Sequence, residues 1–175
     1  MDLDLLISQF RGPLIGLFAS WGASPFDARE LAQDTFAEAY LGRERFHGDH
    51  DDPAQLGAWL RGIANHLHQA HLRRPRRTEP LAGQDPGAET VDPRLEARRE
   101  EIRGALEGLR GPWRTVLQMR YVEGSALSEI AALLGISERS VEGRLHRARK
   151  ELRQVLEART AAGEAGCARS AEDCS

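Results

Sequence analysis

Arginine and lysine side chains gather in one short stretch of the sequence, residues 137–150. Arginine is the commonest reader of guanine edges in a DNA major groove, and both side chains also bind phosphates. The outward-facing positions of this stretch are therefore predicted to contact duplex DNA: Ser137, Arg139, Ser140, Glu142, Arg144, His146, Arg147, Arg149 and Lys150.

The residues around this basic stretch predict a helix, a tight turn and a second helix over 125–150. Gly135 stands where the turn needs a positive φ, which glycine adopts without a Cβ penalty. Ser137 is a suitable N-cap for the second helix. Ile130 and Leu134 are apolar and one turn apart on the first helix, and Val141, Leu145 and Ala148 are predicted to form the buried stripe of the second. This layout is typical of a DNA-binding helix-turn-helix. The alternative is a structural helical hairpin with a solvated basic face.

Two groups of histidines and one pair of cysteines are candidate metal ligands. His66, His68 and His71 lack the spacing of a helical zinc site, and the loop with His47 and His50 is rich only in aspartate. Cys167 and Cys174 are too few to fill a tetrahedral zinc site. We predict no metal and no cofactor. A metal- or redox-sensing tail stays open as a hypothesis beside an inert one.

Composition excludes several classes of protein. No nucleophile elbow, phosphate loop or pair of catalytic carboxylates appears in the sequence, so we do not expect an enzyme. The start MDLDLL lacks the basic region of a signal peptide, and no apolar run approaches the ~20 residues of a membrane helix. We expect a cytoplasmic protein without membrane insertion. Acids dominate residues 1–58 and bases dominate 59–77, which indicates partners of opposite charge.

Apolar spacing predicts helices over residues 3–21, 25–43 and 54–74, with a possible break at Gly12-Pro13. In the second of these helices the predicted buried residues are Phe26, Leu31, Phe36 and Tyr40. Further helices follow residue 92. The fold class is therefore all-α, with two small helical domains joined by a flexible linker and a helix-turn-helix in the C-terminal one. The predicted bounds are 1–77, a linker over 78–93, 94–156, and a flexible tail over 157–175.

Three sequence blocks resemble the extracytoplasmic-function sigma factors of bacterial RNA polymerase. They are DARELAQDTFAEAY, AWLRGIANHLHQAHLRR, and the C-terminal run LRGPWRTVLQMRYVEG, SEIAALLGIS and VEGRLHRARKEL. The resemblance implies that the N-terminal domain binds core RNA polymerase through one face of its second helix. The residues that match this role are Glu30, Gln33, Asp34, Thr35 and Tyr40.

The same resemblance implies that the third helix and the loop before it bind the melted −10 promoter element. The residues assigned to this role are Phe46, His47, Arg61, Asn65, His66, Gln69, Arg73 and Arg74. Trp59 is predicted to be core rather than a stacking platform. The chain reads GIANH where many relatives have RIARN, and Glu142 replaces a common lysine. We therefore expect its promoter sequences to differ from those of relatives.

The function expected from the resemblance is that of a sigma factor. It would bind core polymerase, recognise the −35 element with the helix-turn-helix and melt the −10 element with the N-terminal domain. Its partners would be core polymerase, promoter DNA and an anti-sigma factor. The alternatives are a conventional helix-turn-helix regulator that acts without polymerase, and a helical interaction protein that has lost DNA binding.

Overall fold

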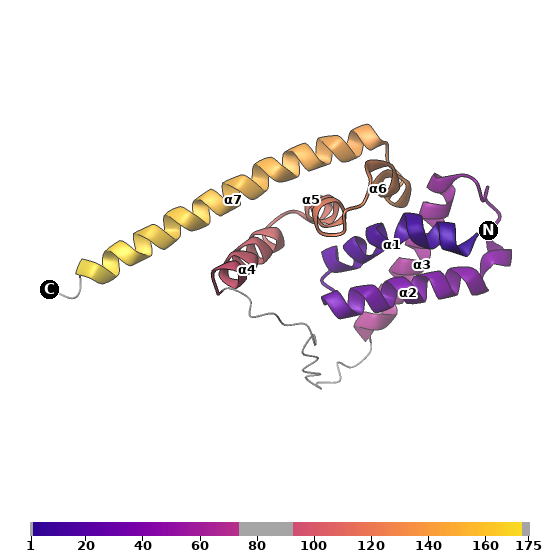
Figure 1. Cartoon of the computed structure of the whole chain (residues 1–175), viewed down its shortest axis with the longest axis horizontal. Coiled ribbons are helices and arrows are strands. Elements are labelled where there is room, and N and C mark those ends of the chain that lie inside the picture. The colour runs from indigo at the N-terminus through magenta and orange to yellow at the C-terminus, as the bar shows by residue number, and fades with distance from the viewer. Residues whose placement is uncertain (1, 74–92, 173–175) are drawn as a thin grey trace. The chain divides into compact units, whose positions relative to one another are not determined.

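A computed structural model describes residues 2–73 and 93–172, and every regular element in those ranges is a helix (Figure 1). The all-α prediction is confirmed for this part of the chain. The predicted linker, apart from its last residue, lies outside the described residues, and so does Arg74.

α1 (Leu3–Ser20) begins at an aspartate cap, because the Asp2 carboxylate accepts the N–H groups of Asp4 at 3.0 Å and Leu5 at 3.3 Å. The helix is continuous through Pro13, where we had predicted a possible break. Proline removes one backbone hydrogen bond. The apolar stripe is buried on both sides of it, which holds the helix together: Leu6, Phe10, Leu14, Leu17 and Phe18.

α2 (Pro25–Leu41) starts at Ser24, whose hydroxyl accepts the N–H of Asp27 at 3.1 Å. Leu31 and Phe36 are buried, as predicted. The predicted burial of Phe26 and Tyr40 was wrong, because their side chains are 69% and 46% exposed. A helix turns about 100° per residue, so Phe26 lies on the side opposite the buried stripe of Ala28, Thr35 and Ala39.

A short 3₁₀ turn, η1 (Arg43–Arg45), and a polar loop lead to α3 (Pro53–Arg73). The carboxylate of Asp52 accepts the Ala54 N–H and the Gln55 amide, both at 2.8 Å. These bonds hold the pKa of Asp52 below its usual value and fix the start of the helix. Every fourth residue of α3 from Leu56 to His68 is buried where the helix packs on its neighbours: Leu56, Leu60, Ala64 and His68.

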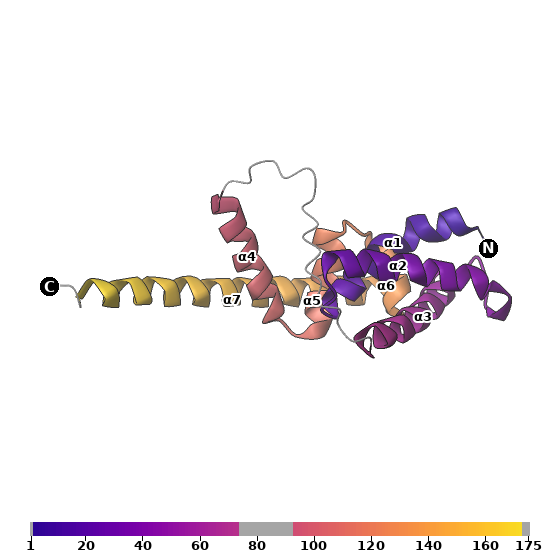
Figure 2. The same cartoon turned by 90° about the horizontal axis from the view of Figure 1, so that it is seen from below.

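The next helical segments pack on α1 and α3 in the same compact unit (Figure 2). They are α5 (Gly111–Leu117), the π-helical turn η2 (Gln118–Val122) and α6 (Leu127–Leu134). This unit also includes the first part of α7, as far as Ala148. This unit therefore contains helices from both sides of the predicted linker, since composition marks a linker but not which helices meet across it.

A second unit contains α4 (Pro93–Glu107) and the part of α7 (Glu138–Glu172) beyond Ala148. Ala105 is fully buried there, and a Cβ on Gly104 would lie 2.7 Å from the Arg159 guanidinium. α7 runs well past Glu157, where we had predicted a flexible tail. The segment has no proline and is rich in alanine, the strongest helix former.

Candidate functional site

The turn between α6 and α7 has the geometry predicted for it. Gly135 lies in the left-handed region at φ 66° and ψ 40°. The N–H of Ile136 donates to the Ala131 carbonyl at 3.1 Å, and the N–H of Gly135 donates to the Ala132 carbonyl at 3.4 Å. These two bonds form a Schellman motif, which ends α6 and reverses the chain.

The start of α7 is capped as expected, because the Ser137 hydroxyl accepts the Ser140 N–H at 3.2 Å. Val141 and Ala148 are fully buried and Leu145 is 5% exposed, so the predicted inner stripe is confirmed. Of the predicted DNA-contacting residues Arg144 is half-buried. The others have exposed side chains: Ser137, Arg139, Ser140, Glu142, His146, Arg147, Arg149 and Lys150.

The predicted polymerase-binding residues of α2 divide into two groups. Glu30, Gln33 and Asp34 are exposed on its acidic face, and Tyr40 is partly exposed with the Arg43 guanidinium 4.6 Å above its ring. Thr35 is fully buried and its hydroxyl donates to the Leu31 carbonyl at 2.7 Å. The assignment of Thr35 to partner binding was therefore wrong, since no partner can reach a side chain on the core face.

Gln33 and Tyr40 also line a groove of about 430 Å³ between α1 and α2. Apolar side chains form much of its lining, and Arg11 and Arg29 add positive charge to it. Sequence periodicity did not reveal this groove, because it depends on where α1 lies relative to α2. It gives the exposed face of α2 a concave apolar neighbour of the kind that receives side chains of a partner helix.

The predicted −10 residues of α3 form an exposed polar face: Asn65, His66, Gln69 and Arg73. The Arg73 guanidinium donates to the Gln69 amide oxygen at 3.4 Å. In the preceding loop His47 is exposed, and Phe46 is half-buried with its ring centroid 4.9 Å from Trp59 and 5.0 Å from His50. Phe46 of the loop therefore lies against Trp59 of α3, the helix that carries the polar face.

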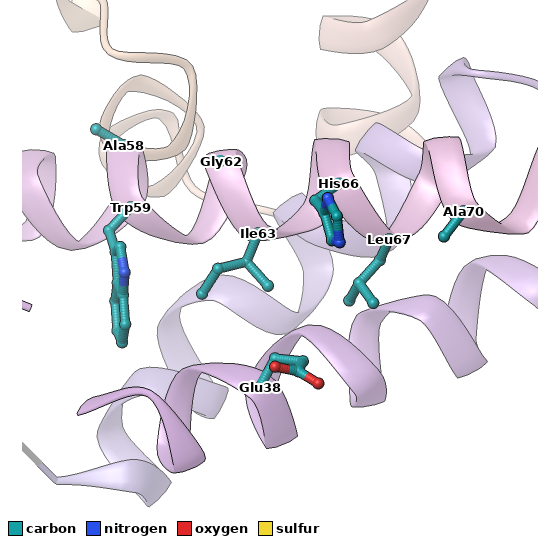
Figure 3. Close-up of a pocket in the computed structure, with 8 residues that line it drawn as sticks. All are labelled: Glu38, Ala58, Trp59, Gly62, Ile63, His66, Leu67 and Ala70. Carbon is teal, nitrogen blue, oxygen red and sulfur yellow. The ribbon is translucent and has the colours of Figure 1, made fainter. Parts of the chain in front are cut away.

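A second groove, of about 600 Å³, lies between α2 and α3 next to this polar face. Figure 3 shows Trp59, Ile63 and Leu67 projecting from α3 toward α2, where Glu38 lies. Trp59 is only half-buried, so its predicted place in the core was not correct. His66 belongs to both the polar face and the groove lining. Stacked aromatic rings beside hydrogen-bonding groups can hold an unstacked base.

Arg61 is not placed as predicted. It was assigned to DNA phosphates, but its guanidinium donates to the carbonyl oxygens of Leu133, at 3.3 Å, and Leu134. These carbonyls lie in the last turn of α6, where no intrahelical donor is left for them and the helix end is negative. In this arrangement Arg61 is a C-terminal cap for α6.

His68 is the one histidine of α3 in the buried stripe. It is 9% exposed, and its ring lies 5.0 Å from Trp21 and 6.3 Å from Phe18 between centroids. Burial, and to a lesser degree the nearby His71, lowers the pKa of His68 below its usual value. Its role is packing, because a neutral imidazole among aromatic rings suits a core position.

Within residues 2–73 and the described side chains that follow α4, no three histidine, cysteine or acidic side chains are grouped as a metal site would need. Cys174 lies outside the described residues. No helix in the described ranges is both long and apolar enough to cross a membrane.

Comparison with known proteins matches both halves of the chain to one family. The Sigma-70 region 2 family matches residues 6–78, and the Sigma-70 region 4 family matches residues 99–152. The chain is 32% identical over 153 residues to the RNA polymerase sigma factor CnrH of Cupriavidus metallidurans, which covers 79% of this chain and 78% of CnrH. It is 27% identical over 164 residues to the ECF sigma factor SigE of Mycolicibacterium smegmatis.

The chain spans 61% of the length of SigE and 34% of the length of RfaY, a probable sigma factor of Xanthomonas campestris. Among solved structures, CnrH in complex with the cytosolic domain of CnrY matches 89% of the chain with a TM-score of 0.53 and 26% identity. RpoE of Bartonella quintana, in complex with the anti-sigma factor NepR, has the same fold at a TM-score of 0.50 and 21% identity. The chain therefore belongs to the extracytoplasmic-function group of sigma factors within the sigma-70 family.

Proposed function

We propose that this chain binds core RNA polymerase and directs it to specific promoters. The observation that supports this most is the presence, in one chain, of an exposed acidic helix face and a capped helix-turn-helix with exposed basic residues. A regulator that acts on DNA alone needs only the second. The polymerase would supply the catalysis, so the chain contributes recognition and works in the cytoplasm with its partners.

The polymerase contact is proposed for the α2 face with Glu30, Gln33, Asp34 and Tyr40. Carboxylates on a helix surface attract a basic partner and speed its association. The groove beside Gln33 and Tyr40 adds apolar area that a helix of the polymerase would cover. Polar and apolar contact together suit an interface that must form and release.

The −35 contact is proposed for the N-terminal turns of α7, which a helix-turn-helix places in the major groove. Arg139 and Ser140 are exposed in the first turn, where side chains reach base edges. Arg147, Arg149 and Lys150 lie further along the helix, where basic side chains bind phosphates and position the domain.

The −10 contact is proposed for the polar face of α3 and the groove lined by Trp59 and His66. An unstacked base would enter this groove, and Asn65 and Gln69 would bond to the exposed strand. Replacing Gln69 with Ala should slow promoter melting, measured by the fluorescence of 2-aminopurine placed in the −10 element. An unchanged melting rate would remove Gln69 from this role.

The proposal is tested by adding the purified chain to core polymerase and a fragment library of genomic promoters, with no other sigma factor present. We expect specific run-off transcripts. Asp34→Arg should abolish them by placing a cation against a basic partner, while the same charge reversal at exposed Glu157, far along α7, should leave transcription unchanged. Duplex DNA binding without any transcript would instead favour a conventional regulator.

An inhibitory protein partner is also part of the proposal. The similar structure of CnrH was solved in complex with the cytosolic domain of CnrY. An anti-sigma factor for this chain should reduce transcription in the same assay, and recovery of a bound protein from the native host would identify it.

A further inference from the structure

Gly143 is an interior residue of α7 that the fold does not require to be glycine. Its φ is not positive, unlike that of Gly135. It is also unlike Gly57, where a Cβ would lie 2.6 Å from the Ala132 carbonyl carbon of the packed α6. Apart from the α7 backbone and its chain neighbours, the one described atom within 4 Å of a Cβ on Gly143 would be Arg147 Nη2, at 3.7 Å, which is an ordinary contact. Alanine would therefore fit at this position.

Glycine at this position lowers the stability of α7. It loses more backbone freedom on folding than any other residue, so inside a helix it is less stable than alanine. No close packing of the described residues against Gly143 offsets that loss. A residue that costs stability and that the fold does not need points to a requirement outside the chain.

Gly143 lies near the middle of the α7 face that is proposed to enter the major groove. It is two residues from Val141 and two from Leu145, both buried, and a helix turns about 100° per residue, so it lies roughly 160° from each. Arg139 and His146, about one turn before and after it, are exposed. The outward face therefore has a notch at Gly143, bounded by Arg139, His146 and Arg147.

The chemistry of the notch suits an apolar group. Gly143 has no side chain, and in a helix interior its N–H and C=O belong to the helical hydrogen bonds, so the notch offers Cα–H but no free donor or acceptor. In the major groove the base edges present nitrogen and oxygen atoms, and the apolar group that projects among them is the C5-methyl of thymine. A methyl group removed from water in this notch would stabilise the complex.

We propose that Gly143 determines specificity by receiving the C5-methyl group of a thymine in the −35 element. The inference rests on the proposed function and deepens it, because it names the base that one position of α7 selects. A Cβ at residue 143 would occupy the space of that methyl group. It would also hold α7 further from the groove floor and lengthen the base contacts proposed for Arg139.

The test uses a DNA duplex that the full chain, with core polymerase present, selects from a random-sequence pool, and core polymerase alone gives the background. Each thymine of the selected site is replaced in turn by deoxyuridine, which lacks only the C5-methyl group. The protein variant is Gly143→Ala. Ser8→Ala is the matched control, because Ser8 is exposed on α1 outside every proposed contact and its replacement also raises helix propensity.

Gly143→Ala should raise the melting temperature by about 1–4 °C. It should weaken binding of the selected duplex roughly tenfold, because one base contact is lost. Binding of a random duplex should change less than about twofold, since phosphate contacts dominate it. Because stability rises while specific affinity falls, unfolding cannot explain the loss. Ser8→Ala should leave both affinities unchanged.

Deoxyuridine at one position should weaken binding by the parent about threefold to tenfold, the value of one buried methyl group. The same replacement should have little effect on Gly143→Ala, whose Cβ already excludes the methyl group. Three results would each overturn the proposal: deoxyuridine without effect at any position, deoxyuridine with the same effect on both proteins, or parental affinity in Gly143→Ala.

Failure of the proposed function gives a different pattern. If the parent and core polymerase bind the selected duplex but produce no transcript, the sigma function fails, and the duplex comparison still decides the role of Gly143. If specific transcripts form but Gly143→Ala binds as the parent does, the sigma function stands and the proposal for Gly143 fails. If no sequence is enriched above background, both fail.

Discussion

The α6–α7 turn and α3 are both proposed to meet DNA, yet different levels of structure position their side chains. In the turn, the bonds that orient α7 lie within six residues of one another, from Ala131 to Ile136. On α3, the placement of Arg61 depends on residues more than seventy positions away. Local bonds make the first site predictable, while the second depends on which helices pack together.

This difference has a consequence for how each site can change. A locally built turn presents the same recognition surface whether or not α6 touches α3. The α3 surface depends on tertiary packing, because Arg61 donates to the last carbonyls of α6 and the groove near Trp59 is completed by Glu38 of α2. We therefore expect substitutions in the turn to act locally, and substitutions on α3 to report on the packing of the whole unit.

The largest effect is expected from Gly135→Val, which changes the locally bonded turn between α6 and α7. A β-branched residue at φ 66° is strained, so the free energy of unfolding should fall by roughly 1–3 kcal/mol and −35 binding should be lost. Urea unfolding and duplex binding measure both. Gly135→Asn should retain most of the stability, since asparagine tolerates this region. Equal loss in both variants would show that φ is not the cause.

Arg139→Ala should separate recognition from folding in the turn. Its side chain is exposed, so the free energy of unfolding should change by less than about 0.5 kcal/mol. Loss of a bidentate base contact should weaken −35 duplex binding by about tenfold to a hundredfold, or 1–3 kcal/mol. Fluorescence anisotropy at fixed salt measures the affinity. Uniform weakening on specific and random duplexes would assign Arg139 to phosphate instead.

Ser137→Ala tests the cap of α7. The hydroxyl accepts the Ser140 N–H, and its removal should lower the free energy of unfolding by about 1 kcal/mol. Ser128→Ala is the control, because Ser128 is exposed inside α6 and caps nothing that the structure records. Thermal unfolding of both variants is sufficient. A cap that contributed nothing would leave the two melting temperatures equal.

The smallest effect should come from a change of pH acting on His68, whose burial depends on tertiary packing. Burial lowers the pKa of His68, so the unfolded chain binds a proton near pH 6.5 that the folded chain resists. The stability that neutral, buried His68 contributes is therefore fully present above about pH 6.5 and declines as the pH falls below that value. His68→Phe should lose less stability between pH 7.5 and 5.5 than the parent, and His66→Gln should behave like the parent.

Much of the fold could be predicted, and the misses have physical causes. Caps and turn glycines were correct because they act over three or four residues, as Ser24, Gly135 and Ser137 do. Thr35 was misassigned because a match to a family pattern does not show on which side of a helix a residue lies. The helix beyond Glu157 differs from the predicted flexible tail because its small residues include many alanines, which favour helix.

The sequence alone determined most of the helices, several of their caps, the helix-turn-helix and the family of the chain. Each of these depends on short-range spacing or on matching motifs. Only the tertiary structure decided that α6 rests on Gly57, that Arg61 caps α6 and that Trp59 lines a groove. Those features depend on distances between segments far apart in the chain. Helical periodicity says which face is apolar, but not which neighbour covers it.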